Sequence, residues 1–182
     1  GTVSTGLIRS LDSDGFTVST VSNVNGNSIT YYYIAIRKET SDPDFNYGSY
    51  TGNATDNRNI TGVGFQPTLV IIKADDGSQI GFLSDNNDSD SSGSHPISTG
   101  ATITSNTIQT LQSDGFQVGS HSAVNGNGII YYWFTFRSVT RRMITGTYTG
   151  NATDDRNITG LGFQPNWILI NRYSPTTSGT DV

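Results

Sequence analysis

The sequence predicts an all-β protein of antiparallel strands, organised as a repeat. Thr, Ser, Gly and Asn together supply 84 of the 182 residues. Glu, Lys and Met, which favour helices, occur only once, twice and once, whereas Thr, Val, Ile and Tyr favour pleated strands. Short apolar runs alternate with Gly- and Asn-rich turns, and these runs recur at a fixed spacing.

Two sequence blocks each occur twice. The first block, which holds Tyr50–Asp56 and Gly64–Pro67, recurs 98 residues later, starting at Tyr148. The second block, which holds Ser13–Phe16 and Val24–Asn27, recurs 100 residues later. The chain is therefore built from two kinds of half-repeat.

The order of the blocks predicts three segments. Residues 46–140 form a complete module, residues 1–45 hold only a second half, and residues 141–182 hold only a first half. The fold class that follows is two small antiparallel β-sandwich (jelly-roll-like) modules in tandem, one of them split between the N- and C-terminal segments. The two halves of the split module are expected to pair within one chain, between chains or along a longer tandem array. The alternative is that the segment boundaries are arbitrary and the chain ends are frayed.

Turn pairs define the second half of each module. Asp14-Gly15 and Asn25-Gly26, and their copies 100 residues on, are pairs typical of tight hairpins. After a run that ends at Leu11 or Leu111, they predict a three-stranded antiparallel meander. Its later strands are Phe16–Val21 and Ile29–Arg37, with the copies Phe116–Gly119 and Ile129–Arg137.

The first half of each module carries two further apolar runs. Tyr47–Thr51 precedes the turn-rich segment Gly52–Asn59, and a second run follows at Leu69–Lys73. The copy of that second run is Trp167–Asn171. Both runs are predicted to be short strands.

The strand around Tyr33 and its copy around Trp133 are rich in aromatic residues. Both faces of these strands are apolar, which predicts a central position covered on both sides. Packing in the core is the favoured interpretation. The alternative is a platform on which sugar rings stack, with Tyr33 and Trp133 as candidate glycan- or receptor-binding residues.

One loop has the opening spacing of a calcium site. Asp88, Asp90 and Ser92 alternate before Gly93, and alternating oxygen ligands before a sharp turn are typical of such loops. Thr99 stands where the bidentate Glu is expected, so a solvated polar loop is the favoured interpretation. No cofactor is expected, and calcium is the single candidate.

Charge and composition exclude several functional classes. The net charge is −5, which argues against a nucleic-acid partner. No apolar run approaches the length of a membrane span, so no membrane insertion is expected. There is no cysteine, neither histidine has the spacing of a metal ligand, and no catalytic constellation occurs in both copies. We therefore expect a protein that is not an enzyme.

The sequence also carries a family resemblance. Gly64–Pro67 and Val70–Lys73, followed by Ser113–Val118 and the aromatic Tyr132–Phe134, resemble a module of bacteriophage tail and virion-surface proteins and of bacterial surface repeats. The resemblance implies a β-sandwich, lectin-like domain with a structural or receptor-binding role. It implies no catalytic residues.

Two functions remain open from the sequence. The first is a structural repeat of an extracellular or virion fibre that self-assembles by completing split modules, between subunits or along a tandem array. The segments that complete one another are represented by Phe16, Tyr32, Phe163 and Trp167. The alternative is a receptor- or glycan-binding module of a phage tail or surface adhesin. The expected partners are the protein itself and a host-surface glycan or receptor.

Overall fold

The computed structural model describes residues 8–31, 33, 35–37, 43–75, 81–85, 93–97, 104–139 and 142–171. The chain divides into two compact units, Gly1–Glu39 and Thr40–Val182, and each is described by itself. The described residues form antiparallel sheets, with two four-residue helical turns besides. The predicted all-β class is confirmed.

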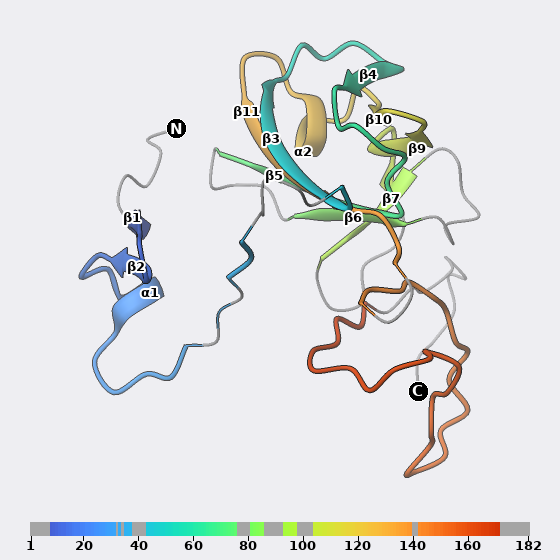
Figure 1. Cartoon of the computed structure of the whole chain (residues 1–182). Helices are drawn as coiled ribbons and strands as arrows, with labels where there is room; N and C mark the ends of the chain where they lie inside the picture. Colours follow the sequence, from blue (N-terminus) through green and yellow to red (C-terminus); the bar gives the residue numbers. More distant parts are fainter. Residues whose placement is uncertain are drawn as a thin grey trace, which may run out of the picture. The chain divides into compact units, whose positions relative to one another are not determined.

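The larger sheet of the second unit has six strands. Its order is β3 (Phe45–Thr51), β11 (Ile130–Phe136), β5 (Leu69–Ala74), β6 (Phe82–Asp85), β7 (Gly93–Pro96) and β8 (Thr104–Ser105). Strand β11 lies between β3 and β5 and pairs antiparallel with both (Figure 1). Its predicted central position is therefore confirmed, whereas β6, β7 and β8 were not predicted.

The smaller sheet has three strands, β4 (Arg58–Thr61), β10 (Gly115–Val118) and β9 (Ile108–Gln112), in that order. The Asp114-Gly115 turn between β9 and β10 is formed as predicted, and Gly115 has a φ of 145°. Both sheets contribute side chains to one hydrophobic core, which includes Phe116, Ile72 and Tyr131. Two sheets around a shared core fit a β-sandwich.

The predicted three-stranded meander is wrong, because β10 and β11 belong to different sheets. They are joined by the helical turn α2 (Ser122–Asn125). Gly126 has a φ of −60°, so Asn125-Gly126 is not the predicted hairpin turn, which needs positive φ at both residues. Gly126 is closely packed, since a Cβ there would lie 2.9 Å from the end of the Ile129 side chain and 3.1 Å from the Tyr131 hydroxyl.

The first unit repeats only part of this arrangement. Strands β1 (Ile8–Asp12) and β2 (Gly15–Val18) pair as a hairpin, followed by the helical turn α1 (Ser22–Asn25). The described residues of the predicted strand Ile29–Arg37 form no strand. Its copy β11 is hydrogen-bonded on both sides, and the first unit contains no third strand among its described residues.

Residues 142–171 also lack the strands of their copy. Apart from an isolated bridge between Val139 and Met143, the described residues there join no sheet, and the predicted strand Trp167–Asn171 is not formed. In Figure 1 this orange-to-red segment carries no arrow. A second sandwich is therefore not assembled by the described residues, and the split module stays a prediction.

Candidate assembly surfaces

The central module shows how the two kinds of half-repeat fit together. Asn125 is fully buried, and its side-chain oxygen accepts hydrogen bonds from the Asn53 amide at 3.0 Å and from the Arg58 guanidinium at 3.1 Å. Its side-chain nitrogen donates to the carbonyls of Thr55 at 2.8 Å and Gly119 at 2.9 Å. One residue of the second half thus holds the loop of the first half with every polar atom paired.

Asp114 forms a second clamp between the halves. Its carboxylate accepts hydrogen bonds from the backbone amides of Gly62 at 3.1 Å and Gly64 at 2.6 Å. Both glycines have positive φ, 84° and 87°, a conformation that costs glycine little. The carboxylate therefore fixes the turn that follows β4.

Aromatic side chains join the halves inside the core. The Tyr50 ring stacks on Tyr131 with centroids 5.3 Å apart, and the Arg58 guanidinium lies 5.1 Å from the centroid of Tyr50. Burial raises the pKa of the Tyr50 phenol, Tyr131 adds to the rise, and Arg58 opposes it. The hydroxyl of Tyr50 stays protonated and donates to the Val124 carbonyl.

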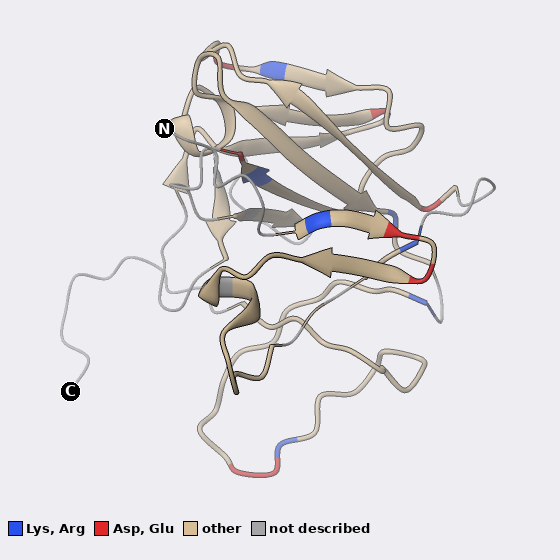
Figure 2. Cartoon of the chain, turned by 90° about the vertical axis from the view of Figure 1, so that its left-hand side faces the viewer, with Lys and Arg blue, Asp and Glu red and all other residues tan. Residues whose placement is uncertain are grey.

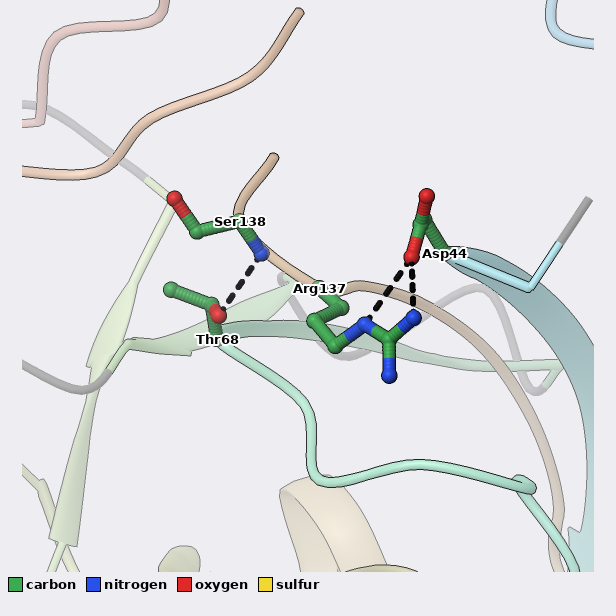
Figure 3. A network of polar contacts seen from close by, with 4 residues as sticks. All are labelled: Asp44, Thr68, Arg137 and Ser138. Atoms are coloured by element: carbon green, nitrogen blue, oxygen red, sulfur yellow. Dashed lines mark hydrogen bonds and ion pairs between the residues drawn. The ribbon is translucent and has the colours of Figure 1, made fainter. Parts of the chain in front are cut away.

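Polar contacts join the residues that flank β3, β5 and β11 at one end of these strands. Arg137 donates to one carboxylate oxygen of Asp44 from Nε at 2.9 Å and from a terminal nitrogen at 2.6 Å (Figure 3). The Ser138 amide donates to the Thr68 hydroxyl at 2.8 Å. The chain therefore enters and leaves the central module at one edge, where the Arg137 amide also bonds the Asp44 carbonyl at 2.8 Å.

The half-repeat in the first unit keeps the local contacts of its copy. Tyr31 donates to the Ser22 carbonyl, as Tyr131 does to the Ser122 carbonyl. The Gly26 amide bonds the Tyr31 hydroxyl at 2.9 Å, against 2.7 Å for the equivalent bond in the central module. The local fold of this half thus forms without its complement.

The half-repeat at 142–171 likewise keeps the local contacts and turn conformations of its copy. The Arg156 guanidinium lies 5.5 Å from the centroid of Tyr148 and donates to the Thr149 carbonyl, as Arg58 does at Tyr50 and Thr51. The φ of Ala152 is 55°, against 56° for its copy Ala54. The turns of this half therefore have the shape that they have in the folded module.

These two half-repeats expose apolar side chains that their copies bury. Ile168 is 62% exposed and Ile170 65% exposed, whereas Val70 and Ile72, the equivalent residues of β5, are both at 0%. The exposed large hydrophobic residues of the two half-repeats are Ile8, Leu11, Val21, Ile29, Tyr31, Tyr33 and Ile36 in residues 8–37, and Ile144, Tyr148, Ile158, Trp167, Ile168, Leu169 and Ile170 in residues 142–171. Clusters of exposed apolar residues are typical of interaction surfaces, and Trp167–Ile170 are four exposed in succession.

Three of the four residues predicted to represent subunit completion are described, and one of them, Trp167, belongs to the exposed set. Phe16 and Phe163 are half-buried, and Trp167 is exposed. The Phe16 ring contacts Tyr33 edge-on, with centroids 5.1 Å apart. Tyr32 lies outside the described residues.

The two candidate glycan residues have opposite environments. Tyr33 is 71% exposed, but Trp133 is only 8% exposed and packs edge-on against Phe116, with centroids 5.7 Å apart. Gly48 lies directly across from Trp133 and leaves room for the indole, since a Cβ there would lie 2.6 Å from the ring. Trp133 is a core residue in this structure and does not offer a surface platform for a sugar.

The candidate calcium residues Asp88, Asp90 and Ser92 lie outside the described residues. Within the part of the chain that is described, no group of three or more His, Asp or Glu side chains is placed to hold a metal ion. Charged residues are few and scattered along the described ribbon (Figure 2). No helix among the residues searched is long and apolar enough to cross a membrane.

The clamps formed by Asn125 and Asp114, and the space that Gly48 leaves for Trp133, were not predicted from the sequence. All three recur in the other copy, as Asn25, Asp14 and Gly146. That repetition was a usable signal, but the partners of these residues lie about 50 to 85 positions away. Only the three-dimensional pairing identifies them.

Comparison with known proteins gives one match. A family model described as a domain of unknown function, DUF7483, matches residues 11–138 and, in a second overlapping stretch, residues 90–180. No curated protein and no solved structure matches the chain. Two overlapping matches are consistent with the internal repeat.

Proposed function

The chain belongs to the family of that domain, DUF7483, and we propose that it is a structural repeat of an extracellular or virion fibre. In this proposal the half-repeats that lack a complement are completed by complementary halves of neighbouring copies or repeats. The role is architectural and involves no catalysis.

One observation carries the proposal. The repeated apolar segment is fully buried at Val70 and Ile72 in one copy but exposed at the equivalent Ile168 and Ile170 in the other. Fully burying one such side chain contributes about 1.5–3 kcal/mol. Seven large exposed hydrophobic residues in each end segment therefore supply a strong driving force for completion.

The test is sedimentation velocity over a concentration series, with negative-stain imaging of the same samples. We expect species that grow with concentration and form regular filaments. A single 19.5 kDa monomer at every concentration would overturn the proposal. Ile168→Asp should abolish growth, whereas the matched variant Asn166→Asp adds the same charge at a nearby exposed polar residue and should not.

A receptor- or glycan-binding role is the second candidate. The observation in its favour is a set of exposed aromatic rings, Tyr33 at 71%, Tyr47 at 62% and Tyr132 at 52%. Tyr47 and Tyr132 lie on the neighbouring strands β3 and β11, where their rings offer flat apolar surface to a sugar. Binding on a glycan array that is lost in Tyr47→Ala and Tyr132→Ala, without loss of folding, would support this role.

A further inference from the structure

We propose that residues 142–171 of one copy dock on residues 8–37 of a second copy, in the register that the corresponding halves hold in the central module. This inference rests on the proposed function and deepens it by naming the partner surface and the residue pairs. The template is the pairing of β3, β4 and β5 with β10 and β11. Residues 142–171 repeat the first half at an offset of 98, and residues 8–37 repeat the second at an offset of 100.

The template fixes each cross-strand pair. Four observed pairs in the central module are Tyr131 with Tyr50, Phe116 with Ile60, Thr135 with Val70, and Phe136 with Leu69. Moved by the two offsets, they become Tyr31 with Tyr148, Phe16 with Ile158, Ala35 with Ile168, and Ile36 with Trp167.

The side chains suit this register. Five of the six buried core positions of the first half keep an apolar residue in the copy, and the exception is Ala74, whose copy is Arg172. The replacements are Ile158 for Ile60, Leu161 for Val63, Phe163 for Phe65, Ile168 for Val70, and Ile170 for Ile72. A shift by one residue would turn these side chains to the opposite face of the strand, so burial selects the template register.

The backbone of both halves is already shaped for docking. Gly160 and Gly162 have φ values of 94° and 76°, close to the 84° and 87° of Gly62 and Gly64, which Asp114 clamps. The equivalent carboxylate on the other half is Asp14, in the β1–β2 turn. Preformed turns reduce the ordering cost of association.

A second copy is the proposed occupant, because neither segment has its complement within its own compact unit. Among the described residues, 142–171 contribute no strand to any sheet, and residues 29–31, 33 and 35–37 contribute none. Each copy carries one half of each kind, so docking joins two different surfaces. Such head-to-tail contacts generate open chains of subunits when the rotation does not close.

One pair departs from the template and provides a gain-of-function test. Asp44 and Arg137 form an ion pair at 2.6 Å, but the equivalent residues are Arg142 and Arg37. Two cations at this position weaken docking. We expect Arg142→Asp to lower the concentration at half-association about twofold to fivefold, and Arg142→Ala to give a value between those of the unchanged protein and Arg142→Asp. An unchanged or raised value in Arg142→Asp overturns the register.

Cysteine pairing between two chains tests the register directly. Thr30 and Thr149 occupy the positions of Ile130 and Thr51, which lie opposite each other with both side chains exposed. The sequence has no cysteine, so Thr30→Cys and Thr149→Cys each carry a single thiol. The two variants are prepared so that their masses differ, and they are then mixed under mild oxidation. They should form a disulfide between positions 30 and 149, because a disulfide needs closely opposed Cα atoms.

The matched control is Thr147→Cys, two residues along the same strand face and out of register with Thr30. We expect at least about tenfold less 30–147 than 30–149 product. Oligomers that favour the 30–147 link overturn the register but leave the proposed function standing. A purely monomeric protein overturns both. A Thr30→Cys/Thr149→Cys double variant that links only within one chain at every concentration overturns the second copy as occupant.

Discussion

The side-chain oxygen of Asn125 accepts a hydrogen bond from the Arg58 guanidinium at 3.1 Å, across 67 positions of sequence. Asn125 ends the helical turn α2, and Arg58 begins β4. The contact joins the two halves of the central module at a point where no water reaches the amide, since Asn125 has 0% exposure. It also distinguishes the completed module from the first unit, where the copy Asn25 is exposed.

Replacing Asn125 by Ala should therefore destabilise the central module. The change removes four hydrogen bonds, one buried and three part-buried, and each partner that stays buried and unsatisfied costs about 1–3 kcal/mol. We expect a loss of about 3 kcal/mol or more, measured by chemical denaturation. Asn25→Ala is the matched control and should change monomer stability by less than about 0.5 kcal/mol; equal losses in the two variants would contradict the clamp.

Gly48→Ala should strain the core beneath Trp133. Its Cβ would lie 2.6 Å from the buried indole, and overpacking of this kind costs about 1–3 kcal/mol. Thermal unfolding measures the loss. Gly146→Ala, at the equivalent position, has no atom within 4 Å of the added Cβ, so the monomer should keep its melting temperature. A destabilised Gly146→Ala monomer would show that this half is already packed.

Acid should weaken the β1–β2 hairpin. Hydrogen bonds from the hydroxyls of Ser10 and Thr17 lower the pKa of Asp12 below 3.8, and the Thr17 bond is 2.8 Å long. A carboxylate whose pKa is lowered by folding stabilises the fold when the pH is above its pKa in the unfolded chain. That contribution is lost as the pH falls through its pKa in the folded state.

Carbon-13 NMR of the Asp12 carboxyl checks this titration. We expect a midpoint below 3.8, and Thr17→Val should move it up towards 3.8. A midpoint at or above 3.8 in the unchanged protein would remove the proposed hydrogen-bond stabilisation.

Tryptophan fluorescence should report completion of the half-repeats. Trp167 is 59% exposed and Trp133 is 8% exposed, so Trp133→Phe leaves one reporter on the candidate surface. The residue equivalent to Trp167 in the central module, Leu69, is half-buried between neighbouring strands. Emission from Trp167 should shift to shorter wavelength, and acrylamide quenching should fall, as the concentration rises. A spectrum that is independent of concentration would count against burial of Trp167.

Two turns of similar composition differ in how far their local sequence determines their conformation. The Asp114-Gly115 turn was predicted correctly, because Gly115 has a φ of 145°, a local requirement that only glycine meets readily. Asn125-Gly126 has the same kind of sequence signature but forms part of a helical turn and its C-terminal flank. The deciding contacts of Asn125 reach Asn53, Thr55 and Arg58, and no local pattern reveals them.

The sequence by itself determined the all-β class, the repeat and the conformation of those turns that local sterics fix. Ala54 and Ala152 have nearly the same positive φ, 56° and 55°, although only the first lies in a completed module. Only the tertiary structure decided which apolar runs become strands. Ile130–Phe136 is a strand because β3 and β5 satisfy its backbone on both sides, whereas Trp167–Asn171 has no such neighbours and forms none. Turn conformations depend on short-range sterics, but a strand needs hydrogen-bond partners from distant sequence.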